Sequence, residues 1–274
     1  MGSAGHVPLR LRQPSPPVSR LAGMQQHLHP HLEHLHFPNE STSYRQARNA
    51  LLEEEMELRR HVERVAQQRR ALPKGGEIPE DYVFEGRRPS GRTGRLKLSE
   101  LFAPGKDTLA IYSFMFGPER AEPCPGCTHF LDGLDGAAQH IGQRMNLAVV
   151  AKSPFKRLQD LAKQRGWQHL RLLSTAGNTY DRDYYGDSTA LSEAMRDQQE
   201  FKPGEEWDMP ILNVFRREED GTIRHFWASE LLYVPAEPGQ EYRHNDLIDP
   251  LWNMFDVTPE GRGDFQPKVD YRAG

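Results

Sequence analysis

The sequence predicts an α/β fold built on a partly parallel sheet. Three short segments, 108–116, 147–151 and 170–173, are almost continuously apolar, which is typical of strands covered on both faces. Two segments with apolar residues at helical spacing separate them. Strands that alternate with helices in this way are joined by right-handed crossovers and lie parallel in one sheet.

Both intervening helices have clear sequence signals. In the first, apolar residues recur at helical spacing directly after a pair of cysteines: Phe130, Leu131, Leu134, Ala137, Ala138 and Ile141. In the second, Ser153 is predicted as the N-cap and Pro154 as the first helical residue, because proline needs no amide hydrogen there. Gly166 is predicted to end this second helix.

Five further elements are predicted around these strands and helices. The segment 97–102 closes on the sheet, and 188–201 forms a weakly periodic helix. The segments 210–215 and 223–228 are two strands joined by a polar turn, which favours an antiparallel hairpin. The aromatic segment 247–255 is predicted to dock as a short helix.

The N-terminal part of the chain is predicted to hold a tail and a long helix. Residues 1–42 are rich in proline and have no sustained apolar period, which predicts disorder. The tail contains a histidine cluster that is either a loose metal-binding tract or part of an unstructured extension: His27, His29, His31, His34 and His36. The predicted divisions are the tail 1–42, a helix and connector over 43–96, a main domain over 97–260 and a flexible tail over 261–274.

The helix predicted over 44–71 is amphipathic. Ser43 and Gln46 have the spacing of a capping box at its start. Its apolar stripe recurs at steps of three, four or seven residues: Tyr44, Ala47, Leu51, Leu58, Val62 and Val65. The stripe is predicted to pack either on the main domain or on a partner chain, and the second case would give a homodimer.

Charge and composition exclude several classes of function. The 274 residues carry a net charge of −4 and no long basic run, so we expect no nucleic-acid partner. No apolar run is long enough for a membrane span and no signal peptide is recognised, so we expect no membrane contact and a cytoplasmic protein. Structural disulfides are rare in that compartment, so the only two cysteines favour a redox motif.

Cys124 and Cys127 stand three apart, between a buried strand and the first turn of a helix. Unpaired amides and the helix dipole at such a turn lower a cysteine pKa, and the thiolate is the reactive form. Cys124 is therefore the predicted nucleophile and Cys127 the residue that resolves a mixed disulfide, while Pro125 suits the first turn. Structural zinc needs four ligands, and only His129 and His140 follow nearby. A structural zinc module is therefore kept only as an alternative to the redox motif, and we expect no metal and no other cofactor.

A second feature lies at the start of the strand 210–215. Met209 and Pro210 stand where a cis peptide bond would turn the preceding backbone towards an incoming substrate peptide. The simpler interpretation is a trans proline that only begins a strand. We predict that Met209 and Pro210 bind the substrate beside the dithiol.

Four segments carry a resemblance to a known family: 112–118, 124–127, 174–184 and 246–256. Over about 44–260, the chain resembles a bacterial family of thioredoxin-like proteins catalogued as a domain of unknown function and described as predicted dithiol–disulfide oxidoreductases. The resemblance implies a thioredoxin-like three-layer sandwich, with a mixed sheet flanked by helices and an added N-terminal amphipathic helix.

The chain differs from ordinary thioredoxins around the dithiol. Pro123 stands where thioredoxins have a tryptophan, and the strand before the site lacks their buried acid. Tyr112 and Ser113 in that strand are hydrogen-bonding groups but poor bases. Glu119 and Glu122 precede the site and either raise the pKa of the nucleophile by like-charge repulsion or are solvated.

The predicted function is thiol–disulfide exchange. The Cys124–Cys127 dithiol reduces a disulfide of a protein or of a small thiol through a mixed disulfide, and an unidentified electron donor restores it. One alternative is a thiol peroxidase in which Cys124 becomes a sulfenic acid that Cys127 resolves. Another is a thioredoxin-fold binding module without catalysis. Four side chains near the third strand are either substrate contacts or aromatic anchors: Tyr180, Arg182, Tyr184 and Tyr185.

Overall fold

The computed structural model describes residues 35–199, 201–202, 204–245 and 247–271. The chain divides into two compact units, residues 1–71 and 72–274. The boundary between units therefore lies at Ala71, not near the predicted start of the main domain at residue 97. Among the described residues, no helix is both long enough and apolar enough to cross a membrane.

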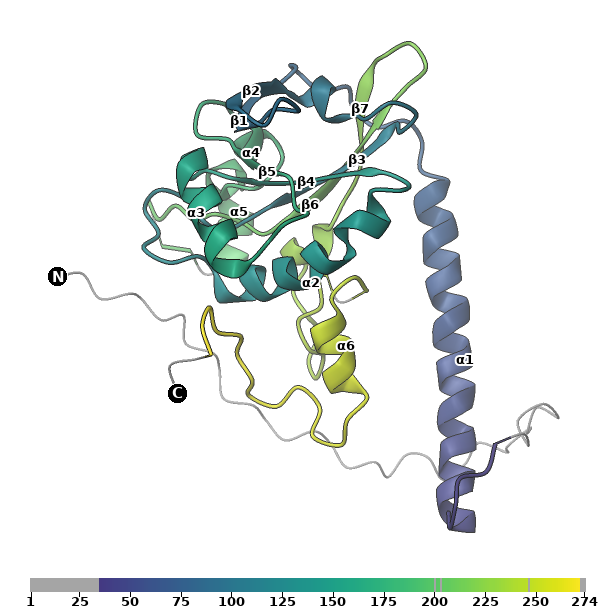
Figure 1. The fold of residues 1–274 in the computed structure, drawn as a ribbon. Coiled ribbons are helices and arrows are strands. Elements are labelled where there is room, and N and C mark those ends of the chain that lie inside the picture. Colours follow the sequence, from purple (N-terminus) through teal and green to yellow (C-terminus); the bar gives the residue numbers. More distant parts are fainter. Residues whose placement is uncertain (1–34, 200, 203, 246, 272–274) are drawn as a thin grey trace. The chain divides into compact units, whose positions relative to one another are not determined.

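The first unit contains α1 (Thr42–Arg70), drawn in Figure 1. Its N-cap is Ser41, whose extended backbone lets its Oγ accept a hydrogen bond from the amide of Tyr44 at 3.1 Å. The predicted cap at Ser43 is therefore wrong, because Ser43 already lies inside the helix. No residue of α1 is buried, and side chains of its apolar stripe such as Leu58 are exposed.

Most of the histidine cluster lies outside the described residues: His27, His29, His31 and His34. The fifth member, His36, pairs through Nδ1 with Glu40 at 3.0 Å, and Glu40 also pairs with Arg45 at 2.5 Å. Within the described part of the chain, no group of three or more His, Cys, Asp or Glu side chains is arranged to hold a metal ion. For the cluster as a whole, the predicted unstructured extension and the alternative of a metal-binding tract both stay untested.

The second unit is built on a mixed sheet that has seven strands within the described residues (Figure 1). The strands are β1 (Val83–Arg87), β2 (Thr93–Lys97), β3 (Thr108–Ser113), β4 (Asn146–Ala151), β5 (Leu172–Ser174), β6 (Leu212–Arg217) and β7 (Ile223–Ala228). Their order is β2-β1-β5-β4-β3-β6-β7. As predicted, β3, β4 and β5 are parallel, and β6 and β7 form an antiparallel hairpin beside β3.

The β1–β2 hairpin corrects the predicted division of the chain, which assigned 43–96 to a helix and a connector. The hairpin extends the sheet, because β1 pairs with β5. Each strand has five residues and buries alternate side chains such as Phe84 and Leu96, a pattern too short to predict a strand. Gly86 permits the pairing, since a Cβ there would lie 2.5 Å from Cδ2 of Leu173.

Helices cover both faces of the sheet, so the predicted three-layer sandwich is confirmed (Figure 1). On one face, α2 (Pro125–Ile141) and α3 (Phe155–Arg165) contribute Leu131 and Leu158 to a core shared with Val149 of β4. On the other face, Tyr180 of α4 (Tyr180–Asp183) and Leu101 of the 3-10 helix η1 (Leu98–Leu101) share a core with β3 and β4.

β5 begins later than predicted because a side chain of α2 binds the backbone that precedes the strand. The Asp135 carboxylate of α2 accepts the backbone amides of His169 and Leu170 at 2.8 and 2.9 Å. These amides are therefore unavailable to the sheet, and β5 begins at Leu172 instead of residue 170.

The start of α3 also differs from the prediction. Pro154 is the N-cap, and Ser153 is fully buried with its amide donating to the carbonyl of Phe116 at 3.2 Å. Gly166 ends α3 in the left-handed conformation, with φ 79°, as predicted. The helix predicted over 188–201 is two short pieces: η2 (Ser188–Ala190) and α5 (Glu193–Gln198).

The chain after β7 contains η3 (Glu230–Tyr233) and α6 (Pro250–Asp256), the second close to the predicted helix. The predicted flexible tail over 261–274 is packed in its described part. Arg262 pairs with Asp256 at 2.7 Å, and the ring of Phe265 lies 5.1 Å from that of Phe255. Arg165 of α3 also donates to the carbonyl of Val269, so this segment is part of the folded unit.

Candidate active site

The dithiol lies where α2 leaves the sheet. Cys124 is the N-cap of α2, Pro125 begins the helix, and Cys127 lies in its first turn. The amide of Cys124 donates a hydrogen bond to the carbonyl of Met115 at 3.1 Å. This contact holds Cys124 close to the end of β3. Both cysteines are free thiols, Cys124 partly exposed and Cys127 only 3 % exposed.

The surroundings of Cys124 favour its thiolate. The neighbouring Cys127 thiol is the largest influence that lowers the pKa of Cys124, and the backbone amides of Cys127 and Gly126 act in the same direction. The charge of Arg120 acts in the same direction. Together these contributions outweigh burial and lower the pKa of Cys124 to about 6.

Cys127 has the opposite environment. Burial raises the pKa of this thiol well above its ordinary value, and the neighbouring negative charge of Cys124 adds to the effect. The hydroxyl of Tyr112 and the amide of Met115 donate hydrogen bonds to its sulfur and offset part of that rise. The two cysteines therefore differ chemically: the partly exposed Cys124 has a lowered pKa, and the buried Cys127 has a raised pKa.

Arg120 is a site residue that the sequence analysis missed. The acidic neighbours Glu119 and Glu122 were considered as influences on the nucleophile, whereas the loop residue that lowers the pKa of Cys124 is Arg120. Its position four residues before the cysteine was the available signal. The guanidinium also lies over the ring of Trp207, 5.9 Å from its centroid.

A single side chain of α3 holds this loop. The guanidinium of Arg157 donates to the carbonyls of Gly117 and Ala121 at 3.0 and 2.9 Å and also to the carbonyl of Arg120. It stacks on the ring of Phe116, 4.1 Å from the centroid. One arginine therefore fixes the backbone between β3 and the dithiol.

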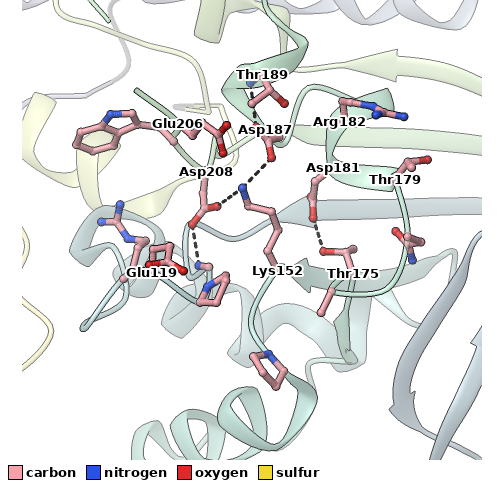
Figure 2. A pocket seen from close by; sticks show the side chains of 17 residues that line it. Glu119, Lys152, Thr175, Thr179, Asp181, Arg182, Asp187, Thr189, Glu206 and Asp208 are labelled. Atoms are coloured by element: carbon pink, nitrogen blue, oxygen red, sulfur yellow. Dashed lines mark hydrogen bonds and ion pairs between the residues drawn. The ribbon is translucent and has the colours of Figure 1, made fainter. Parts of the chain in front are cut away.

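Residues 117–120 of this loop also line a pocket of about 710 Å³ (Figure 2). It is formed by the segments that follow the carboxyl ends of β3, β4 and β5, a common location for ligands in α/β sheets. Figure 2 shows the Lys152 amino group between Asp187 and Asp208, at 2.8 and 2.9 Å. Asp208 also accepts a hydrogen bond from the amide of Gly117 at 2.7 Å, so this charged group holds the loop as well.

Asp181 lines the same pocket but is almost completely buried, at 5 % exposed. Burial raises its pKa to about 6, although the hydroxyls of Thr175 and Ser113 donate hydrogen bonds to the carboxylate. Gly186 permits this approach, because a Cβ there would lie 2.4 Å from Oδ1 of Asp181. No sequence pattern predicts a buried acid at this position.

Met209 and Pro210 require a correction. The peptide bond between them is trans. The amide of Met209 donates to the carbonyl of Gly186 at 3.0 Å, and its own carbonyl accepts the amide of Ile211 at 3.2 Å. Because both backbone groups have partners inside the fold and the side chain is buried, the backbone does not turn outward as the cis interpretation required.

The tyrosines after β5 are mainly aromatic anchors. Tyr180 is fully buried, and Tyr184 packs between the rings of Phe215 and His225. Tyr185 is exposed with a positive φ of 58°. Of the four candidates, Arg182 lines the pocket of Figure 2.

The C-terminal segment contributes a buried carboxylate that contacts α2. Asp249 is the N-cap of α6, and its Oδ2 lies 2.8 Å from Nε2 of His129. The rings of His129 and Trp252 meet edge to face at 5.7 Å between centroids. Neither residue pair was expected near the dithiol, because more than 100 residues of sequence separate α2 from α6.

These features define a thioredoxin-like protein. In the order β4-β3-β6-β7, two parallel strands are joined through α2, an antiparallel hairpin lies beside them, and two cysteines open the connecting helix. The chain belongs to the family described as bacterial protein of unknown function (DUF899), whose model matches residues 34–273. No curated protein matches the chain.

Solved structures similar to this chain include several peroxiredoxins. Peroxiredoxin Q from Xanthomonas campestris is 12% identical, with a TM-score of 0.39, and the match covers 56% of this chain and 85% of that one. Oxidized Prx3 from Vibrio vulnificus is 11% identical, with a TM-score of 0.37, 56% of this chain and 88% of that one being covered. Reduced 2-Cys peroxiredoxin from Plasmodium vivax is 14% identical, with a TM-score of 0.38, and the coverages are 64% and 91%.

Proposed function

We propose that this protein is a thiol–disulfide oxidoreductase in which Cys124 is the nucleophile and Cys127 the resolving residue. One observation supports this most strongly: Cys124 is the partly exposed N-cap residue of α2 and Cys127 lies in the first turn of the same helix, so the second thiol and the first helical amides favour a thiolate at Cys124. A pKa of about 6 means that the sulfur is largely a thiolate at neutral pH. The nucleophile is partly exposed and its partner is one helical turn away.

The reaction has two displacement steps. The Cys124 thiolate attacks one sulfur of a substrate disulfide, the substrate S–S bond breaks, and its other sulfur leaves as a thiolate. Cys127 then loses its proton and attacks the Cys124 sulfur, which releases the second substrate thiolate. Two electrons pass from the dithiol to the substrate, the two released thiolates take up protons from solvent, and a dithiol reductant restores the protein.

The substrate is a disulfide of a protein or of a small thiol that reaches Cys124 from its exposed side. Pro210 is half-buried and lies just before β6, and we propose that it contacts the substrate. The buried Met209 holds Pro210 in that position. This contact uses the proline ring, since the backbone groups of Met209 are already paired.

The pH dependence of Cys124 alkylation in the reduced protein tests the proposal. We expect a midpoint near 6, and loss of this reactivity in Cys124→Ser, while Cys127→Ser keeps a reactive Cys124 but cannot release a mixed disulfide. A midpoint at the ordinary thiol value of about 8.5 would remove the argument for an activated nucleophile. Peroxide consumption that exceeds disulfide reduction would favour the peroxidase alternative instead.

A further inference from the structure

A second pocket, of about 610 Å³, lies apart from the dithiol. Its lining comes from the connector before β1, from α4 and the chain after it, from β6 and β7, and from η3. Tyr184, one of the lining residues, packs against the core on the face of the sheet opposite α2. The volume lies within the range of pockets that hold small molecules.

The floor of this pocket is apolar or already hydrogen-bonded. Ile211 and Ala228 are buried there, at 1 % and 7 % exposed. The side-chain amide of Asn213 donates to the carbonyl of Tyr184 at 3.1 Å, and its oxygen lies 3.0 Å from Nε2 of His225. Because both ends of that amide have partners, a ligand group that reaches the floor meets mainly apolar atoms and ring faces.

Two pairs of aromatic rings line the sides of the pocket. The ring of Tyr184 is stacked on that of His225, with 5.7 Å between centroids, and the rings of Tyr185 and Tyr233 are 6.0 Å apart. Tyr185 is exposed and has a φ of 58°, a region that bulky residues rarely adopt. The Tyr233 hydroxyl donates to the Tyr185 carbonyl at 2.6 Å and so holds this exposed ring at the pocket.

The charged residues of the lining are all acidic. Glu77, Asp183 and Glu230 are exposed, and none of the described residues that line the pocket is a lysine or an arginine. Asp183 lies 3.5 Å from Arg182, and Glu77 lies 3.6 Å from Arg224. Glu230 forms no ion pair with another described residue, so its charge at the mouth of the pocket is not compensated.

These properties together select one class of ligand. Ring faces and carboxylates both attract a positive charge, and aromatic sites of this kind recognise quaternary ammonium groups. A bare ammonium group would need hydrogen-bond acceptors to replace its water, whereas methyl groups on the nitrogen fit an apolar floor. A phosphate, a sulfate or a carboxylate would be repelled by the acidic mouth.

We propose that this pocket binds the alkylated ammonium group of an organic cation. The methyl groups contact the floor at Ile211 and Ala228, and the charge lies against the faces of the tyrosine rings. Glu230 adds attraction at the mouth. The site does not depend on the proposed function, because neither cysteine lines the pocket.

Calorimetric titration of the full chain with choline tests the proposal. The comparison compound is 3,3-dimethylbutan-1-ol, which has the same shape as choline but no charge. We expect choline to bind at least roughly tenfold more tightly than this alcohol, and also more tightly than 2-aminoethanol, which keeps the charge without the methyl groups. Equal binding of choline and the alcohol, or no saturable binding of choline, would overturn the proposal.

The same head group can belong to a free small molecule or to a protein side chain. A peptide that contains trimethyllysine separates these two sources. Tighter binding of choline than of the peptide would assign the site to a small cation, and tighter binding of the peptide would assign it to a methylated protein. Both results support a site for an alkylated ammonium group.

Variants place the bound choline in the pocket. Tyr185→Leu should weaken choline binding roughly tenfold, while Tyr185→Phe, which keeps the ring, should bind as the wild type does. Glu230→Gln should weaken binding about threefold at low salt. Its matched control is Glu219→Gln, which removes the same charge from an exposed residue of the β6–β7 turn outside the pocket.

Unchanged binding in both Tyr185→Leu and Glu230→Gln would place the choline elsewhere and overturn the proposal. Equal weakening in Glu230→Gln and Glu219→Gln would do the same, because it would show an effect of net charge alone. Rescue by Tyr185→Phe distinguishes a contact with the ring face from a structural role of the tyrosine hydroxyl.

Discussion

Asp181 illustrates how a single residue links the fold to pH. Its carboxylate is enclosed by the hydroxyls of Thr175 and Ser113 and by the backbone at Gly186, and burial raises its pKa from 3.8 to about 6. A raised acid pKa means that the folded state holds the proton more tightly than the unfolded chain. The resulting stability is fully present below about pH 4 and is lost as the pH rises through about 6.

Asp181→Asn should remove this pH dependence. The asparagine is neutral at all pH values and keeps an acceptor for one hydroxyl and a donor for the other. From pH 4 to pH 7, the wild type should lose about 3 kcal/mol of unfolding free energy relative to the variant, the equivalent of a pKa change of about two. Urea unfolding at both pH values measures the difference. Parallel pH profiles for the two proteins would contradict the prediction.

The active-site loop is held by side chains from two distant parts of the chain. Arg157 of α3 binds three loop carbonyls, and Asp208, just before β6, binds the amide of Gly117 with Lys152 behind it (Figure 2). Neither contact is local in sequence. Helix α3 therefore does more than cover the sheet, because its Arg157 holds the loop in which Arg120 lies near Cys124.

Arg157→Lys should disturb this loop even though it keeps the positive charge. An ammonium group cannot reach three carbonyls in the fork geometry of a guanidinium, so we expect a loss of about 2 kcal/mol in unfolding free energy. The alkylation midpoint of Cys124 should also rise, because Arg120 is held less closely.

Arg165→Lys is the control, since Arg165 lies on the same helix and binds Asp132 and the Val269 carbonyl instead. It should lose stability without a change in the Cys124 midpoint. A midpoint shift of equal size in both variants would show that the effect is not specific to the loop.

At the scale of the whole molecule, the division at Ala71 separates a helix with no buried residue from a unit with its own core on both faces of a sheet. Folding free energy arises mainly from burial of apolar surface, and α1 contributes little of it. The sheet unit, residues 72–274, should therefore fold without the preceding residues.

A chain that begins at residue 72 should unfold within a few degrees of the full chain and keep the same Cys124 alkylation midpoint. Thermal unfolding and alkylation measure the two properties. Sedimentation of both chains tests the predicted homodimer at the same time, because pairing through the α1 stripe would be lost with the helix. A large fall in the melting temperature would show that α1 supports the sheet unit.

The sequence alone determined the local features of this protein. Several elements were predictable because their apolar patterns extend over enough residues: strands β3, β4, β6 and β7 and helices α2 and α3. The cysteine pair was also predictable, because a single helical turn sets the spacing of Cys124 and Cys127. Strands β1 and β2 were not predictable, because each is short and buries only alternate residues.

Tertiary structure alone decided which distant side chains meet. The sheet and its crossovers bring together elements that are distant in sequence. Three such contacts are those of Arg157 with the loop, Lys152 with Asp187 and Asp208, and His129 with Asp249. Local spacing carries no information about such pairs, since the register between packed elements is fixed by side-chain volume and by burial across the whole core.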